Sequence, residues 1–235
     1  MPTRRPTATA SAPLPAIQAR ALETSDRLLD AAEAVLAADG LVGATVPAIA
    51  ERAGVAVGTV YKRFPDKDAL LRCAYERAFL RAAEGNRAAL APDRWVGWSA
   101  ARLTRVLVGS MVSGYRRKQT LLAALARYAE THPDAAFRRR ADELTADAFD
   151  RVGALLLARR DELRHPDPEG AVRLGLLTVG LALRGVLLRG DDGALHPFDG
   201  DDDQFAAELS RQLLAYLGAS GDDDAIPARR SRSNR

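Results

Sequence analysis

The sequence has few of the side chains on which most enzyme chemistry depends. Its 235 residues include one cysteine and three histidines. The single cysteine, Cys73, excludes an intrachain disulfide, and its apolar neighbours on an expected helix predict a buried structural thiol. The histidines stand apart, so no His-Glu-x-x-His spacing occurs, and there is no glycine-rich phosphate loop. These absences argue against an all-helical enzyme, and we expect no catalytic residue, no metal and no cofactor.

Neither sign of charge is in large excess. Lys and Arg number 34 and Asp and Glu number 31, which gives a formal net charge of +3. A wholly basic surface is therefore excluded, and any contact with nucleic acid must come from a local basic patch. The apolar segment 171–188 is interrupted by Arg173 and Arg184, which favours a buried helix over a membrane span. Residues 1–20 contain no apolar run of signal-peptide length. We accordingly expect a cytoplasmic protein with no membrane partner.

Residues 45–71 predict two short helices joined by a tight turn. Thr45 can cap the first helix, Pro47 lies in its first turn, and Gly54 can end it with a positive φ. The apolar face of this helix follows the i, i+3, i+4, i+7 spacing: Val46, Ile49, Ala50 and Ala53. A second helix is expected over about 56–64, where the Phe-Pro pair closes it. This arrangement is a helix-turn-helix pattern.

The second of these helices has two different faces. The side that can pack on other helices carries Val57, Val60, Tyr61 and Phe64. The opposite side is small, hydroxylated and cationic, without an acid: Gly58, Thr59, Lys62 and Arg63. Small residues allow close approach in a major groove, where cations meet phosphates or guanine edges. The alternative is that the cations only solvate an amphipathic helix, but the complete two-helix pattern around them favours DNA contact.

Five segments between residues 24 and 80 form a specific combination. They are Leu-Leu-Asp-Ala-Ala at 28–32, Gly-Val at 54–55, Gly-Thr-Val-Tyr at 58–61, Phe-Pro at 64–65 and Lys-Asp-Ala-Leu-Leu at 67–71. The combination resembles the N-terminal domain of the TetR family of bacterial transcriptional regulators, over about a quarter of the chain. One departure is Val57, which stands where many relatives carry a polar residue. Val57 either contacts a base, through a thymine methyl, or only packs.

The resemblance implies an all-α fold. It has an N-terminal three-helix helix-turn-helix DNA-binding domain and a larger C-terminal helical ligand-binding and dimerisation domain, with about nine helices in total. Each subunit places the helix over about 57–64 in a major groove, and two-fold symmetry repeats this on a palindromic operator of double-stranded DNA. Thr45, Tyr61 and Lys67 then meet phosphates. The expected DNA-binding residues are Thr45, Val57, Gly58, Thr59, Tyr61, Lys62, Arg63 and Lys67.

Composition and proline positions divide the chain into four parts. We expect a disordered arm at 1–20, a DNA-binding domain with its linking helix at 21–90, a helical ligand-binding and dimerisation domain at 91–218, and a disordered charged tail at 219–235. The expected helices outside the helix-turn-helix pair span about 22–38, 67–86, 96–115, 119–131, 134–160, 168–189 and 202–217.

The last two helices are expected to make a homodimer. A helix that is apolar on every side must be covered on every side, and this pair from two subunits would form a four-helix bundle. The interface candidates are Leu183, Leu187, Phe205, Leu209, Leu213 and Tyr216. The alternative is that both helices only fill a core within one subunit.

The resemblance also implies a mostly apolar ligand pocket in the C-terminal domain. Its candidates are Trp98, Met111, Tyr115, Tyr128, Phe137 and Leu176, each of which can equally be plain core. The expected function is that of a nucleoid-associated repressor released from its operator by an apolar small-molecule effector. A ligand-independent or activating regulator of the same fold is the alternative.

Overall fold

The computed structural model describes residues 16–188, 198 and 200–219. Across these residues the chain forms nine α-helices and two short 3-10 helices and contains no strand, so the predicted all-α fold is confirmed. The expectations for residues 1–15, for most of the loop after residue 188 and for the tail from residue 220 lie outside the described residues.

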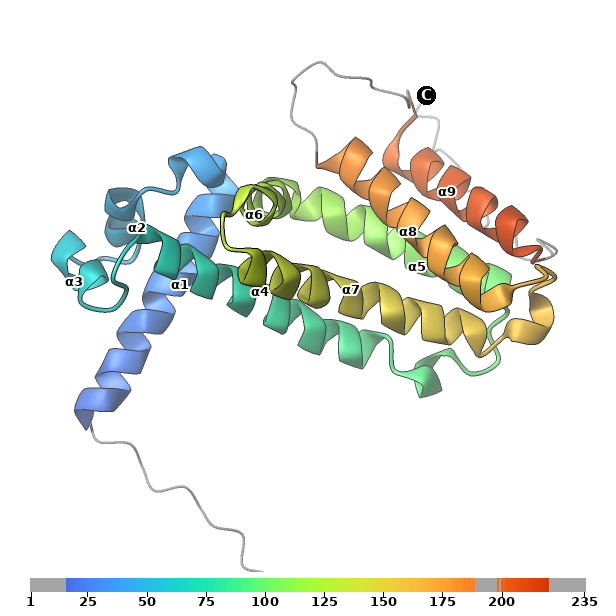
Figure 1. The fold of residues 1–235 in the computed structure, drawn as a ribbon, viewed down its shortest axis with the longest axis horizontal. Helices are drawn as coiled ribbons and strands as arrows, with labels where there is room; N and C mark the ends of the chain where they lie inside the picture. The colour runs from blue at the N-terminus through green and yellow to red at the C-terminus, as the bar shows by residue number, and fades with distance from the viewer. Residues whose placement is uncertain (1–15, 189–197, 199, 220–235) are drawn as a thin grey trace, which may run out of the picture.

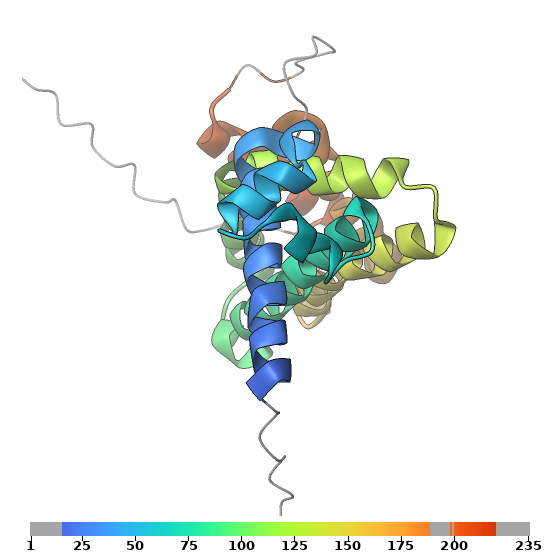
Figure 2. The ribbon, with the colours of Figure 1, turned by 90° about the vertical axis from the view of Figure 1, so that its left-hand side faces the viewer.

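The helices form an elongated molecule, with α3 near one end and α8 and α9 toward the other (Figure 1). Seen from the α3 end in Figure 2, α1, α2 and α3 lie in front, and α4 runs back from them toward the remaining helices. The helices are α1 (Ala16–Gly43), α2 (Val46–Arg52), α3 (Val57–Tyr61), α4 (Lys67–Ala89), η1 (Pro92–Trp95), α5 (Ala100–Arg117), α6 (Gln119–Thr131), α7 (Ala135–Leu157), η2 (Arg160–Glu162), α8 (Pro168–Leu187) and α9 (Asp202–Leu217).

Helix α1 begins earlier than expected. The predicted disordered arm over 1–20 is wrong for residues 16–20, which are helical. Alanine and other good helix formers follow a proline there, and proline is compatible with a helix start. The helix also continues past its expected end near residue 38: Gly40 forms a kink with a φ of 66°, and the helix resumes up to Gly43.

A first core joins the N-terminal helices to two helices of the C-terminal part. Leu28, Ile49 and Leu70 are completely buried in it, and Tyr128 of α6 and Phe137 of α7 belong to the same cluster. The Tyr75 ring of α4 stacks on the Phe79 ring, with 4.6 Å between the ring centroids, and meets the Phe137 ring edge-on, with 5.3 Å between the centroids. The first core therefore contains residues from both sides of the predicted domain boundary at residues 90–91.

A second core lies among α5, α7, α8 and α9, and it corrects the predicted dimer interface. Its members include five of the six interface candidates, all buried within their own subunit: Leu183, Leu187, Phe205, Leu209 and Leu213. These candidates are wrong because the apolar stripe of α9 packs on α5 and α8 of the same chain. Tyr216 is the candidate that stays exposed, at 40%.

The outer face of α8 carries three exposed leucines. Leu174, Leu177 and Leu181 are 51%, 57% and 61% exposed and follow one side of the helix. Within the described residues, α8 is the one helix long and apolar enough to cross a membrane, and 44% of that window is buried in the protein. Such a single helix is weak evidence for a membrane span, because core helices pass the same test.

Burial of Leu213 predicts a specific stability loss. Leu213 is 3% exposed, so Leu213→Ala should lower the free energy of unfolding by about 2–5 kcal/mol, through lost apolar contacts and a residual cavity. The neighbouring Gln212 is exposed, and Gln212→Ala should stay within about 0.5 kcal/mol of wild type. Urea unfolding followed by circular dichroism measures both. Equal stability of the two variants would contradict the assignment of Leu213 to the core.

Candidate nucleic-acid interface

Local capping determines where α2 begins and ends. The Thr45 hydroxyl accepts the N–H of Ala48 at 3.3 Å, and Pro47 lies in the first turn, both as predicted. At the other end Gly54 takes a φ of 65°, and the N–H of Val55 returns to the carbonyl of Ala50 at 3.0 Å. The chain therefore turns sharply after α2, and this turn sets the direction in which α3 leaves it.

Helix α3 is shorter than predicted and is anchored by two side chains. It ends at Tyr61, and the N–H groups of Arg63 and Phe64 both bond to the Val60 carbonyl at 2.9 Å in the turn that follows. The proline after Phe64 disfavours helical geometry there, which accounts for the early end. Val60 is 1% exposed and Phe64 is 8% exposed, so these two hold α3 on the first core.

The side chains expected to share this inner face do not all pack. Val57 is 39% exposed and Tyr61 is 53% exposed. The expectation that both could pack on other helices is therefore wrong, because a five-residue helix can bury only the positions directly over its neighbours. Of the two alternatives for Val57, packing alone does not hold. We call the exposed residues of this segment the α3 surface: Val57, Gly58, Tyr61, Lys62 and Arg63.

The α3 surface and its flanks present cations without acidic partners. Lys62 and Arg63 are exposed and Lys67 is half-buried, and none of the three makes an ion pair or side-chain hydrogen bond with any described residue. Arg77 of α4 behaves differently, because it bonds Asp30 at 2.8 Å. Thr45 lies exposed at the start of α2, and its hydroxyl hydrogen is free to donate. Thr59 is half-buried.

Gly58 is not required by the packing of the chain itself. A Cβ atom added there would meet nothing within 4 Å. Its φ lies outside the left-handed region, so a side chain would cause no backbone strain. Glycine within a helix costs about 0.5–1 kcal/mol relative to alanine. The protein carries this cost at a position that leaves the helix backbone open to approach from outside.

The first turn of α4 is capped and then tied to the C-terminal helices. Asp66 caps α4, because its carboxylate accepts the N–H of Ala69 at 2.7 Å. The next acid, Asp68, accepts the Tyr128 hydroxyl at 2.6 Å and lies 3.0 Å from the His132 ring nitrogen Nε2. Burial alone would raise the pKa of the Asp68 carboxyl, but these hydrogen bonds and nearby Arg72 lower it below its ordinary value.

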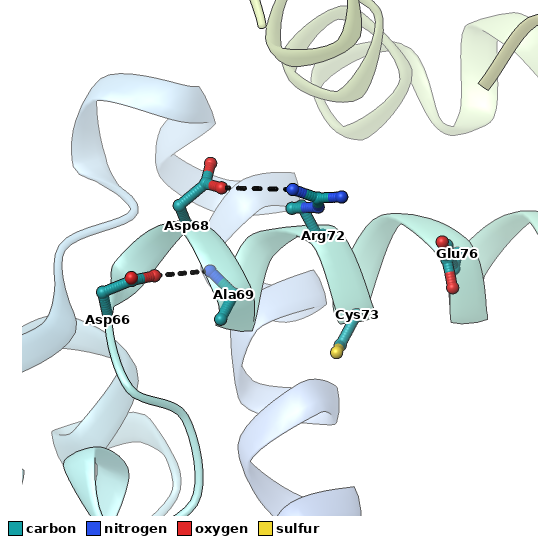
Figure 3. A pocket seen from close by; sticks show the side chains of 6 residues that line it. All are labelled: Asp66, Asp68, Ala69, Arg72, Cys73 and Glu76. Carbon is teal, nitrogen blue, oxygen red and sulfur yellow. Dashed lines mark hydrogen bonds and ion pairs between the residues drawn. The ribbon is translucent and has the colours of Figure 1, made fainter. Parts of the chain in front are cut away.

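A depression in the surface lies along this part of α4 (Figure 3). It is lined by Asp66, Asp68, Ala69, Arg72, Cys73 and Glu76. Cys73 is exposed, so the prediction of a buried thiol is wrong: it occupies the side of α4 that faces away from the core. Partial burial and the Glu76 charge raise the pKa of the thiol, which is the opposite of an activated nucleophile. No group of acids, cysteines and histidines among the described residues has metal-binding geometry.

The predicted pocket residues do not meet in one place. Tyr128 and Phe137 belong to the first core, whereas Met111, Tyr115 and Leu176 belong to or pack against the second. Trp98 lies in the connection before α5, with the Arg102 guanidinium 4.0 Å above its ring. The six candidates therefore lie in three separate parts of the structure.

Residues 28–74 match the family model described as bacterial regulatory proteins, tetR family. These residues form a tetR-type domain.

Curated relatives within the tetR family include two repressors. The chain is 38% identical to the HTH-type transcriptional repressor KstR of Mycolicibacterium smegmatis over 106 residues, which are 45% of this chain and 50% of that protein. For KstR of Mycobacterium tuberculosis the identity is 35%, over 45% of this chain and 46% of that protein. The chain thus spans about half the length of the curated relatives it matches.

Solved structures of transcriptional regulators share the fold. A transcriptional regulator from Rhodococcus sp. Rha1 aligns with a TM-score of 0.62 and 24% identity, over 85% of this chain and 99% of that chain. The fatty acid degradation regulator FadR from Bacillus halodurans aligns with a TM-score of 0.61 and 20% identity, over 84% and 97%. At these identities the likeness shows the fold alone.

The sequence did not reveal that two residues at the end of α6 contact α4. Tyr128 was a pocket candidate and His132 was no site candidate, yet both donate toward Asp68. The three residues lie 60 and 64 positions apart in sequence. No local periodicity signals such a contact. The sequence shows only that His132 precedes a proline, and the structure shows that it is buried.

Proposed function

We propose that this protein is a dimeric, sequence-specific DNA-binding transcriptional regulator, a repressor that an apolar small-molecule ligand releases from a palindromic operator. The observation that carries the proposal is the α3 surface: exposed cations without acidic partners beside a glycine that the fold does not require. A surface of this kind suits a polyanion whose grooves admit a helix. Its place within a tetR-family domain supports the same function.

The proposed contacts follow from the positions of the side chains. Thr45, Tyr61 and Lys67 flank α3 and donate to backbone phosphates, which set the orientation of the domain. Lys62 and Arg63 approach guanine edges or nearby phosphates, with half-buried Thr59 beside them. Exposed Val57 contacts a thymine methyl.

The proposed dimer uses the outer face of α8. Leu174, Leu177 and Leu181 form an exposed apolar row, and Tyr216 of α9 is exposed as well. A two-fold axis would place the same row of a second subunit against it, so that α8 and α9 of both subunits form a four-helix bundle. The resulting pair of α3 helices would contact the two halves of a palindrome.

The proposed effector binds among the C-terminal helices, and the site of action is DNA in the cytoplasm. Met111, Tyr115 and Leu176 lie at the second core, and we infer that they are the pocket candidates nearest one another. A distant structural relative, FadR from Bacillus subtilis, was solved in complex with stearoyl-CoA. The alternative, a regulator without a ligand, keeps the same α3 surface. It is favoured if no small molecule lowers operator affinity.

Gly58 gives a prediction in which stability and DNA affinity change in opposite directions. Gly58→Ala should raise the free energy of unfolding by about 0.5–1 kcal/mol, because alanine is the better helix former. The added methyl should weaken operator binding roughly tenfold, the equivalent of 1.4 kcal/mol, because it blocks close approach to the groove. Thermal unfolding and fluorescence anisotropy with labelled operator measure the two effects.

Gly85 of α4 is the matched control for this variant. It is exposed, and a Cβ atom there also meets nothing within 4 Å. Gly85→Ala should therefore stabilise the protein and leave DNA affinity unchanged. Operator binding by Gly58→Ala at wild-type affinity would show that α3 does not approach DNA closely.

Lys67 and Arg63 should differ in how they contribute to binding. Lys67→Ala should weaken binding to all duplexes alike and reduce the slope of log affinity against log salt by about one unit. Arg63→Ala should in addition relax the base preference at one position of each half-site by about 1–3 kcal/mol. Salt titrations on matched and altered duplexes test both, with exposed Lys118 at the end of α5 as a Lys→Ala control. Wild-type binding by both variants would place the DNA elsewhere.

The exposed row of α8 predicts where the dimer can be broken. Leu177→Asp should convert the dimer to a folded monomer, because an unpaired carboxylate would be buried in the interface. Leu80 of α4 is also about half exposed, at 49%, and Leu80→Asp should remain dimeric. Sedimentation velocity gives the mass, and circular dichroism confirms that each variant is folded. A wild-type protein that sediments as a monomer would contradict the proposed assembly.

A further inference from the structure

Two parts of the chain that are far apart in sequence meet at the first turn of α4. Asp68 receives the Tyr128 hydroxyl on its side chain at 2.6 Å and on its backbone carbonyl at 3.2 Å. The His132 ring nitrogen Nε2 lies 3.0 and 3.2 Å from the two carboxylate oxygens of Asp68. We call Asp68, Tyr128 and His132 the Asp68 cluster. Figure 3 shows Asp68 and Arg72 on one side of α4, turned away from Cys73.

The two donors of the Asp68 cluster are buried and have defined roles. His132 is 4% exposed, and its Nδ1 accepts the N–H of Asp134 at 3.1 Å. The ring proton is therefore on Nε2, which donates to Asp68. Tyr128 is 9% exposed, and burial followed by the bond to Asp68 raises the pKa of its hydroxyl, which keeps it a donor. Removal of the carboxylate would leave both donors without this acceptor inside the protein.

A second pair of contacts strengthens the same junction one turn further along α4. The Arg72 guanidinium pairs with Asp134 at 3.1 Å and lies 5.1 Å from the centre of the Phe137 ring. Asp134 also caps α7 through the N–H of Ala136 at 2.8 Å. Arg138 closes the corner by donating to the carbonyls of His132 and Pro133. The corner between α6 and α7 is therefore a rigid support for the start of α4.

The same turn of α4 follows directly on the α3 surface. Phe64 anchors the end of that segment in the first core, and only residues 65 and 66 separate it from Lys67 at the start of α4. So short a connection limits how far the first turn of α4 can move away from the end of α3, because each residue spans at most about 3.6 Å. A displacement of the first turn of α4 therefore acts directly on the α3 segment.

We propose that Tyr128 and His132 are positioning residues for DNA binding. Acting through Asp68, they hold the first turn of α4, and with it α3, in the orientation that matches the operator. This inference rests on the proposed DNA-binding function and adds the residues by which the C-terminal helices control it. A purely structural role for the Asp68 cluster would change stability without changing the preference for operator over other DNA.

The test compares operator and unrelated DNA for five variants of the full chain. The wild type first selects its operator from a pool of random duplexes. Tyr128→Phe and Asp68→Asn should then lower operator affinity roughly 5-fold to 30-fold, the equivalent of about 1–2 kcal/mol. Affinity for an unrelated duplex should change less than twofold, because it depends mainly on phosphate charge. His132→Gln, which keeps an N–H donor, should retain more operator affinity than either.

Tyr75→Phe is the matched control, because Tyr75 belongs to the same aromatic cluster and its hydroxyl has no hydrogen bond to any described residue. Its operator preference should equal that of the wild type. The double variant of Tyr128→Phe and Asp68→Asn should lose less operator affinity, relative to the wild type, than the product of the two single losses, since both changes act on the same hydrogen bond.

The outcomes separate this inference from the function on which it rests. If the wild type selects an operator and Tyr128→Phe prefers it as strongly as Tyr75→Phe does, the Asp68 cluster is only structural and the inference is wrong. If the wild type selects no sequence, the proposed function itself is wrong, and the positioning role with it. If Asp68→Asn fails to fold, Tyr128→Phe decides, because it removes a single hydroxyl from a ring that stays in place.

Discussion

The burial of Val60 and Phe64 is the contact on which the rest of the arrangement depends. Helix α3 has five residues, far fewer than a helix needs to be stable alone in water. It exists because these two side chains are buried in the first core and because caps and turns restrict the chain on both sides of it. The other side of α3 does not pack on the core, so it can hold a glycine, a tyrosine and two cations that pair with no acid in the described part of the chain.

Because α3 is so dependent on its support, the orientation of the core beneath it matters for function. That core is not confined to the N-terminal helices, since Tyr128 and Phe137 of α6 and α7 complete it. The helix α4 runs from the α3 end of the molecule toward the other helices, beside α7 (Figure 1). A change among the C-terminal helices can therefore reach α3 through packed side chains and a polar junction, without a flexible connection between them.

The sequence predicted the local features well and the long-range ones poorly, for a physical reason. Caps and turns act within a few residues, so Thr45 and Gly54 had the expected geometry. An apolar stripe reveals that a face is covered but not by what, so Leu213 was assigned to a second subunit although its own chain covers it. The two donors to Asp68 lie 60 and 64 residues away in the sequence, beyond the reach of any periodicity.

The central claim is that two copies of α3 enter the major groove on two halves of a palindrome. Dimethyl sulfate modification tests it directly, because it methylates guanine N7 in the major groove, where Lys62 and Arg63 would lie. On DNA bound by the wild-type protein, the account predicts two protected clusters related by two-fold symmetry, with centres about 10 base pairs or a multiple of that apart. Protection at a single cluster, or binding that leaves every guanine N7 reactive, would contradict it.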